Sequence, residues 1–151
     1  MKKFHFPLER VRQWRERQIA VEEAALEKLH SQRALLEESR RLLQSEAAES
    51  VREAARSGMV TATELQAVDS FRRYAMAECV SIAGKLVEFD QQIEAQREKI
   101  REAHRRFELL AKLKERRLQG WQLELNREIE ADAGESFLAK WSSERQAKRE
   151  I

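Results

Sequence analysis

The side chains that could carry out catalysis or hold a metal are few and scattered in this sequence. Its three histidines, His5, His30 and His104, lack the spacing to one another that a metal site requires. A glycine-rich phosphate loop and a serine or cysteine nucleophile motif are absent from the sequence. Adjacent carboxylates such as Glu22 and Glu23 would point to different faces of a helix and so do not form an acid–base pair. We therefore expect no catalytic residue, no metal and no cofactor, and predict that the protein is not an enzyme.

The composition favours long helices over a compact globular domain. Charged residues make up 37% of the chain, compared with roughly 25% in a typical domain. The chain has one proline and four glycines, and the alternating apolar runs that are typical of strands are absent. Its abundant Glu, Arg, Lys, Ala, Leu and Gln are good helix formers. The sequence therefore predicts an all-α protein.

A regular apolar stripe runs along residues 65–110. Its positions recur in alternating steps of three and four residues, and only Arg72 and Gln96 among them are polar. A stripe with this period winds slowly round a straight helix, so a second helix must wrap with it to keep it dry. The apolar positions are Leu65, Val68, Ala75, Cys79, Ile82, Leu86, Phe89, Ile93, Ile100, Ala103, Phe107 and Leu110. We call this stripe the seam.

A weaker stripe predicts a first helix over about residues 8–56, with Pro7 near its first position, where the missing N–H costs little. Leucines recur every seven residues in it, whereas Arg33 and Arg40 occupy positions expected to be apolar. Long arginine stems can still cover the edge of a seam while their charged ends reach water.

A turn is expected at about residues 57–61. Gly58 suits the left-handed residue that ends a helix. Thr61 and Glu64 have the spacing of a capping box, in which each side chain accepts a hydrogen bond from the backbone N–H of the other residue. A short link between two long helices predicts an antiparallel hairpin.

The register of this hairpin can be tested within the sequence, because facing residues of a hairpin have numbers that sum to a constant. The two stripes meet with sums of 118 or 119, which neither stripe requires by itself. The pairs are Leu8 with Leu110, Val11 with Phe107, Ile19 with Ile100, Leu29 with Phe89, Leu36 with Ile82, and Leu43 with Ala75. We therefore predict a long two-helix coiled-coil hairpin.

The second helix is predicted to be longer than the first and to run over about residues 62–132. Gly134 suggests its end, and Ser136 could cap a short C-terminal helix within a tail of residues 133–151. That short helix would carry Phe137, Leu138 and Trp141. No repeat longer than seven residues and no linker is visible, so we expect a single domain over residues 1–151.

Charge is distributed in blocks along the chain. Residues 1–20 carry a net charge of +4, residues 21–96 of −5, residues 97–118 of +5 and residues 119–139 of −4. Such blocks can steer an oriented protein partner. The overall net charge of +2 is too small for a typical nucleic-acid binder.

The single cysteine, Cys79, lies on the seam, and we expect it to be a buried thiol in a reducing compartment. No apolar run approaches the ~18 residues of a membrane span. The first seven residues lack the apolar core of a signal peptide. These observations predict a cytosolic protein without direct membrane insertion.

One hairpin cannot bury all of the apolar surface in this sequence. Off the seam near the turn are Leu42, Met59, Val60, Phe71 and Tyr74. Beyond the start of the first helix, the second helix continues its stripe with Leu118, Trp121, Leu125 and Ile129. Exposed aromatic residues beside basic ones are common anchors of protein interfaces. Partner binding, self-association and packing of the tail all remain open for these surfaces.

The residues from Phe4 to Gln18 have the pattern Phe-x-Phe-x-Leu-x-x-Val at the start of a charged helix. This pattern resembles the opening of the FliJ family of flagellar type III export proteins. The basic block Leu109–Arg117, followed by Trp121, is also similar to that family. The tail Glu135–Trp141 departs from the polar ending that the resemblance implies.

The resemblance implies a hairpin similar to the central stalk of rotary ATPases. Its open end would enter the pore of the hexameric flagellar export ATPase, and its turn half would contact the cytoplasmic domain of the export gate membrane protein. Export chaperones are a further class of partner in this interpretation. By position, the ATPase-binding residues would be Val11, Trp14, Arg15, Leu118 and Trp121. The export-gate-binding residues would be Leu42, Phe71 and Tyr74.

The resulting hypothesis is a non-enzymatic stalk or adaptor that couples the export ATPase ring to the export gate. Such a protein would be cytoplasmic and peripheral at the inner face of the cell membrane, at the flagellar base. Two alternatives remain open at this point. One is the equivalent stalk of a virulence type III secretion system, and the other is a structural coiled coil that self-associates.

Overall fold

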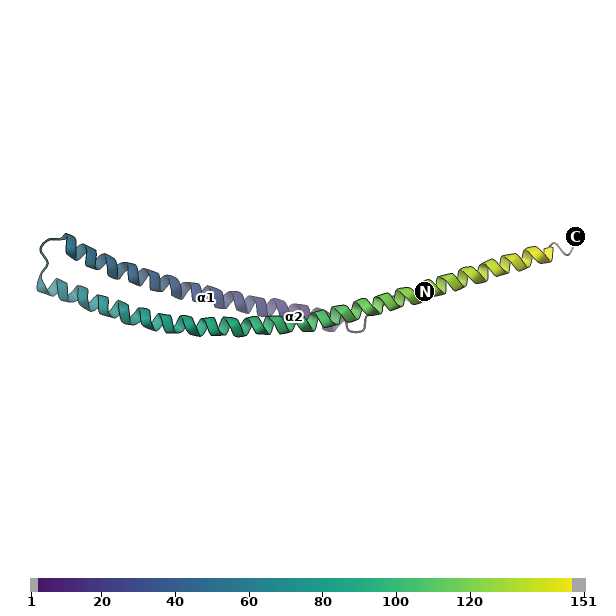
Figure 1. The fold of residues 1–151 in the computed structure, drawn as a ribbon, viewed down its shortest axis with the longest axis horizontal. Coiled ribbons are helices and arrows are strands. Elements are labelled where there is room, and N and C mark those ends of the chain that lie inside the picture. The colour runs from purple at the N-terminus through teal and green to yellow at the C-terminus, as the bar shows by residue number, and fades with distance from the viewer. Residues whose placement is uncertain (1–2, 148–151) are drawn as a thin grey trace. The chain divides into compact units, whose positions relative to one another are not determined.

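The computed structural model describes residues 3–147 and contains two long helices, α1 (Glu9–Arg56) and α2 (Ala62–Ala147) (Figure 1). The two helices are joined by residues 57–61, and no strand occurs within residues 3–147. The predicted all-α hairpin with a longer second helix is confirmed.

The chain divides into two compact units, which are described separately. Residues 17–104 form the hairpin unit, and residues 3–16 together with 105–147 form the terminal unit. Each helix contributes to both units, so each unit contains a pair of segments that are far apart in the sequence.

The turn has the local structure that its residues predict. Gly58 has a φ of 65°, in the left-handed region that favours glycine. The Thr61 N–H donates to the Glu64 carboxylate at 2.8 Å, and the Glu64 N–H donates to the Thr61 hydroxyl at 3.2 Å. The hydrogen bonds from Thr61 hold the pKa of Glu64 below its usual value. The capping box therefore begins α2 at Ala62, as expected.

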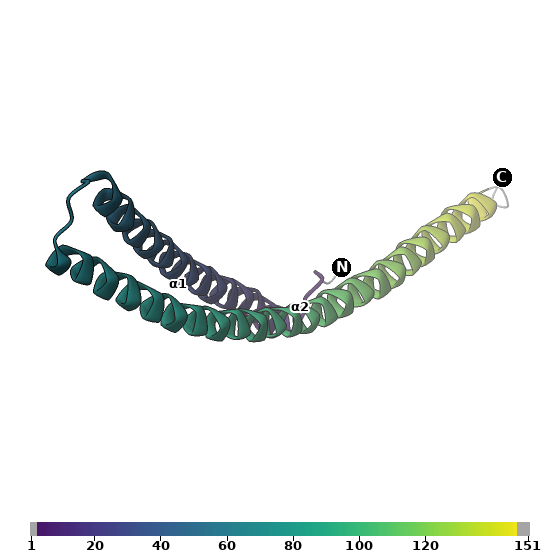
Figure 2. The same cartoon turned by 60° about the vertical axis from the view of Figure 1, so that its left-hand side comes forward.

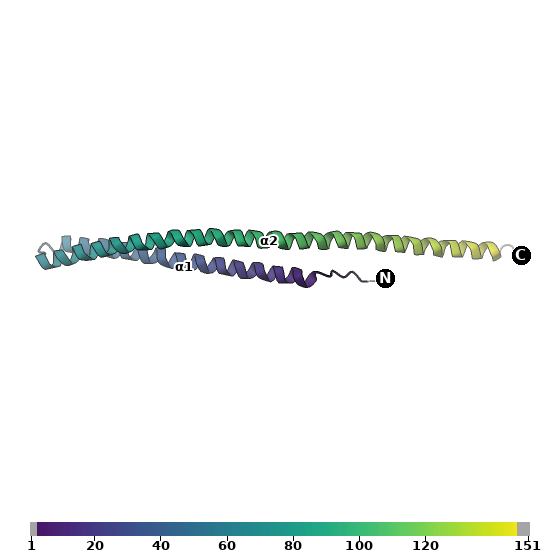
Figure 3. The same ribbon diagram turned by 90° about the horizontal axis from the view of Figure 1, so that it is seen from below.

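In the hairpin unit, α1 and α2 lie side by side and bury the central part of the seam (Figures 1 and 3). The buried side chains on α2 are Ala75, Ile82, Leu86, Ile93 and Gln96, and Ile19 is the buried one on α1. Burial at this spacing is what a coiled-coil seam requires.

One polar contact agrees with the predicted register of the hairpin unit, and a second one links the two helices at the surface. The Gln96 side-chain amide donates to the backbone carbonyl of Glu22 at 3.0 Å, and these two residues have the predicted sum of 118. Arg33 donates to Asp90 at 2.6 Å across the helix pair, which lowers the pKa of the Asp90 carboxyl. The Arg33 stem thus lies at the seam edge while its guanidinium pairs at the surface.

The seam does not close at the turn end, contrary to expectation. Leu65, its first predicted position, is 60% exposed, and Cys79 is only partly buried. The ribbons of α1 and α2 also diverge toward the turn (Figure 2). The helices diverge here, and the small side chains of Ala47 and Ala48 do not fill the space between them.

In the terminal unit, residues 3–8 form no helix but pack against α2. Phe6 is only 5% exposed, and the ring of Phe4 lies 5.9 Å from that of Trp121, centroid to centroid. The N–H of Glu9 donates to the carbonyl of Phe6 at 3.1 Å, so the segment continues directly into α1. The N-terminal residues thus extend the cover that α1 gives to α2.

The predicted end of the second helix at about residue 132 is wrong, because α2 continues to Ala147. Gly134 has no positive φ, and Ser136 lies inside the helix rather than capping a separate one. A glycine costs a helix only about 1 kcal/mol, and the neighbouring Ala, Glu, Leu and Lys residues favour the helix. The last four residues of the predicted tail lie outside the described residues.

Candidate partner-binding surfaces

The residues predicted to bind the ATPase all lie in the terminal unit. Val11, Trp14 and Arg15 are on the first two turns of α1, and Trp14 is 50% exposed with the Arg15 guanidinium 4.7 Å from its ring centroid. Leu118 and Trp121 lie on α2 and are partly covered. The structure therefore places the five residues in one unit but leaves only Val11 and Trp14 largely open to solvent.

An ion cluster holds the start of α1 against α2 in this unit. Glu9 pairs with Arg12 at 2.7 Å and with Lys114 of α2 at 2.8 Å. Hydrogen bonds first from Arg12 and then from Lys114 lower the pKa of Glu9 to about 2. The Arg12 guanidinium also lies 5.7 Å from the centroid of the Phe107 ring, a cation–π distance. These contacts position Val11 and Trp14 relative to α2 within the unit.

The sequence analysis missed Phe4 and Phe6 as parts of this surface. Phe6 is buried, and the Phe4 ring lies against that of Trp121, which was expected to be open. The sequence contained a signal, because two phenylalanines just before a helix start are large apolar side chains that burial stabilises.

The residues predicted to bind the export gate lie in the hairpin unit. Phe71 and Tyr74 form a stacked pair with ring centroids 6.4 Å apart, and Tyr74 is 58% exposed. Leu42 lies on the other helix and is exposed. Met59 and Val60 in the turn are exposed as well, so the predicted apolar surface is present.

A groove runs between the two helices on the opposite flank of the hairpin unit, and we call it the turn groove. Its volume is ≈ 630 Å³, within the range of roughly 300–1,000 Å³ that is typical of binding clefts. Since successive residues turn by ~100° around a helix, Arg72 and Met76 face the flank away from Phe71 and Tyr74. The lining residues are Gln44, Ala47, Ala48, Val51, Arg52, Arg72, Ala75, Met76 and Cys79.

The last part of α2, residues 126–147, has no cover, and we call it the distal segment. Every side chain of residues 126–146 is exposed. Phe137, Leu138 and Trp141 form an apolar cluster on it, with Phe137 68% exposed. The Arg145 guanidinium lies 4.2 Å from the Trp141 ring centroid. A cluster of this kind is typical of an interface that is not yet occupied.

Within residues 3–147, no group of three or more His, Cys, Asp and Glu side chains could hold a metal ion. No helix of that part of the chain combines the length and hydrophobicity of a membrane span. The arrangement offers surfaces for protein contact.

Comparison with known families gives one match. The family described as "Flagellar FliJ protein" matches residues 4–131, which includes the hairpin unit, the N-terminal segment and the basic part of α2. The match ends before Phe137, Leu138 and Trp141. Comparison with curated proteins and with solved structures found no match. With the family match covering most of its length and an antiparallel helical hairpin as its fold, this chain belongs to the FliJ family.

Proposed function

We propose that this chain is the stalk and adaptor of a flagellar type III protein export apparatus. In this proposal it couples the hexameric export ATPase to the export gate and carries out no chemistry of its own. The family match over residues 4–131 carries the proposal. The location that follows is the cytoplasm, at the inner face of the membrane below the flagellar base.

The two units suit two different partners. The terminal unit presents Trp14 beside Arg15, and a half-exposed tryptophan next to an arginine is a frequent hot spot of interfaces. We assign the ATPase to this surface, together with Val11, Leu118 and Trp121. The hairpin unit presents the stacked pair of Phe71 and Tyr74, and we assign the export gate to this pair and Leu42.

The experiment uses the purified export ATPase and the purified cytoplasmic domain of the gate. The full chain should bind both and raise the ATPase turnover. Trp14→Ala should weaken ATPase binding by about thirtyfold and reduce the stimulation, since hot-spot tryptophans contribute ~2 kcal/mol or more. The side chain is exposed in the free chain, so the fold should not change.

Tyr74→Ala is the matched control for the ATPase surface. It removes an exposed aromatic side chain from the other unit, so it should leave ATPase stimulation intact and weaken binding of the gate. Unchanged turnover on adding the chain, with no co-elution, would contradict the proposal. Equal effects of the two substitutions on both partners would contradict the division between the units.

A further inference from the structure

Two surfaces of this chain are complementary to each other. The turn groove has an apolar floor and a basic rim, and the distal segment has an apolar cluster that follows a stretch of acidic residues. We propose that the turn groove of one copy binds the distal segment of a second copy.

The turn groove is an unfilled part of the seam. Its floor is formed by small or apolar side chains, and Val51, Met76 and the nearby Leu65 are all exposed. A heptad seam remains dry only when a partner covers it along its whole length. Here α1 and α2 diverge, and the small side chains of Ala47 and Ala48 leave the space between the helices unfilled. A third helix would complete the packing.

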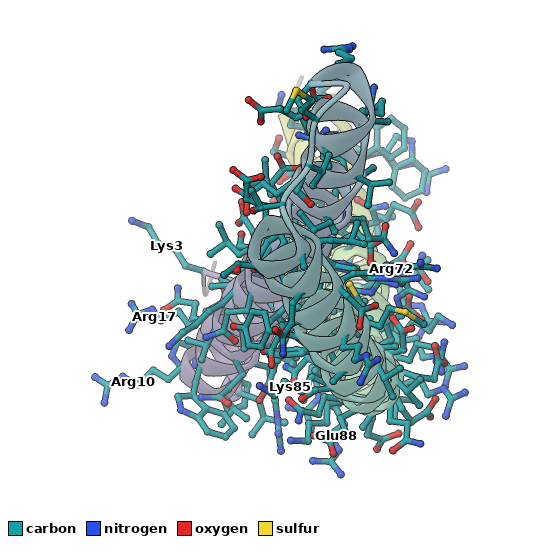
Figure 4. All side chains as sticks on the ribbon, turned by 90° about the vertical axis from the view of Figure 1, so that its left-hand side faces the viewer. Lys3, Arg10, Arg17, Arg72, Lys85 and Glu88 are labelled. Atoms are coloured by element: carbon teal, nitrogen blue, oxygen red, sulfur yellow. The ribbon has the colours of Figure 1, made fainter. Side chains whose placement is uncertain are left out.

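The charge of the turn groove selects for an acidic occupant. Its lining includes Arg52 and Arg72 and no acidic residue. Arg52 pairs with Glu49 at 3.3 Å on its own helix. Arg72 forms no ion pair with any described residue, although it occupies a seam position. Figure 4 shows Arg72 projecting to one side of the hairpin unit, and Lys85 and Glu88 projecting in another direction.

The distal segment has the chemistry that this groove requires. Phe137, Leu138 and Trp141 lie within little more than one helical turn, so they share one side of α2. Residues 124–135, directly before them, contain five acidic side chains and one arginine. The acidic residues are Glu124, Glu128, Glu130, Asp132 and Glu135. Opposite charges on two apolar surfaces favour their association and its orientation.

The distal segment would also gain stability from a partner. An isolated helix shorter than roughly 12–15 residues is marginal in water, and longer ones depend on good helix formers and i,i+4 ion pairs. Within residues 126–147 no ion pair is formed, and Gly134 interrupts the helix formers. Docking in a groove would replace the missing stabilisation by apolar burial.

This contact uses a different side of α2 from the proposed ATPase surface. Trp141 is twenty residues from Trp121, which turns it by roughly 160° around the helix. The self-association therefore does not rest on the proposed function and can be separated from it experimentally. The contact joins two different surfaces, so each copy offers one turn groove and one distal segment to other copies.

Sedimentation velocity of the full chain over a wide concentration range at low salt tests the proposal. We expect a concentration-dependent dimer that weakens as salt is raised, because the contact includes charge pairs. Arg72→Glu in the groove and Trp141→Ala in the distal segment should each weaken association by about tenfold. Both side chains lie at the surface, and circular dichroism checks that the helices are unchanged.

Lys85→Glu is the matched control for Arg72→Glu, since it makes the same charge change on the same helix away from the groove. It should leave association unchanged. A mixture of the Arg72→Glu and Trp141→Ala variants restores one intact contact and should associate more strongly than either variant alone. A chain that sediments as a monomer at every concentration overturns the proposal. An equal loss of association in the Lys85→Glu and Arg72→Glu variants also overturns the proposal.

Discussion

The middle and the end of helix α2 differ in one respect, which is the period of their apolar residues. In the hairpin unit the seam repeats every 3.5 residues and is buried against α1 from Ala75 to Gln96. From Trp121 to Trp141, apolar residues recur every four residues, including Leu125 and Ile129. Each step of four advances the stripe by ~40° around the helix.

This difference explains why one part of the helix has an intramolecular partner and the other does not. A 3.5-residue repeat drifts little, so a single helix can cover it by supercoiling gently. A stripe with a four-residue repeat turns so far around the helix that one neighbouring helix cannot cover it along its length. The distal segment is therefore suited to short, local contacts with another molecule. Four predictions test this distinction, taken here from the largest expected effect to the smallest.

Ile82→Ala should destabilise the chain by about 2–4 kcal/mol, because it removes a side chain that is 4% exposed and leaves a cavity in the seam. Ile129→Ala in the free chain should change stability by less than about 0.5 kcal/mol, since that side chain is already in water. Urea unfolding followed by circular dichroism measures both. Similar losses for the two variants would mean that the end of α2 is covered in solution.

Phe6→Ala should loosen the terminal unit by about 1–2 kcal/mol. This loss of stability is smaller than the loss caused by replacing a fully enclosed phenylalanine, because a terminal segment can open locally. Phe4 would then leave the Trp121 ring, and the Trp121 fluorescence should shift to longer wavelength. The measurement requires Trp14→Phe and Trp141→Phe in the same chain. An unshifted spectrum would indicate that residues 3–8 do not cover Trp121.

Gly134→Ala should stabilise the distal helix by about 0.5–1 kcal/mol. A β-carbon at this position meets no atom within 4 Å, so nothing opposes the substitution. Gly58→Ala is the opposite case, because its φ of 65° is strained for alanine, and it should destabilise the turn. Amide hydrogen exchange should become slower around residue 134 in Gly134→Ala and faster around residue 58 in Gly58→Ala. Loss of helix in Gly134→Ala would show that the glycine is required in the free chain.

The smallest effect is expected from pH at Glu9. Its pKa is lowered in the folded chain from 4.5 to about 2, so its ion pairs stabilise the start of α1 above pH 4.5. This contribution is lost as the pH falls from 4.5 toward 2. Hydrogen exchange at residues 9–16 should therefore accelerate over that interval, and Glu9→Gln should abolish the step. A step that persists in Glu9→Gln would have to come from another carboxylate.

Much of the fold could be predicted because its determinants are local or periodic. The limits of α1, the capping box at Thr61 and the register through Gln96 and Glu22 follow from spacing alone. The end of α2 could not be predicted from Gly134, because a helix propensity is a small free energy that neighbouring residues outweigh. For the candidate surfaces, the exposure of Trp14, Phe137 and Tyr74 agreed with their positions off the seam.

The sequence by itself determined where the helices turn and which residues face each other. The two heptad stripes and the position of the capped break between them are consistent with one antiparallel pairing. Only the tertiary structure decided how closely the two helices approach. It showed that a groove lined by Arg72 and small side chains remains at the turn end, and that Phe6 is buried before the start of α1. The physical reason is that periodicity sets the direction of a side chain, whereas the volume between two backbones depends on every residue that lines it.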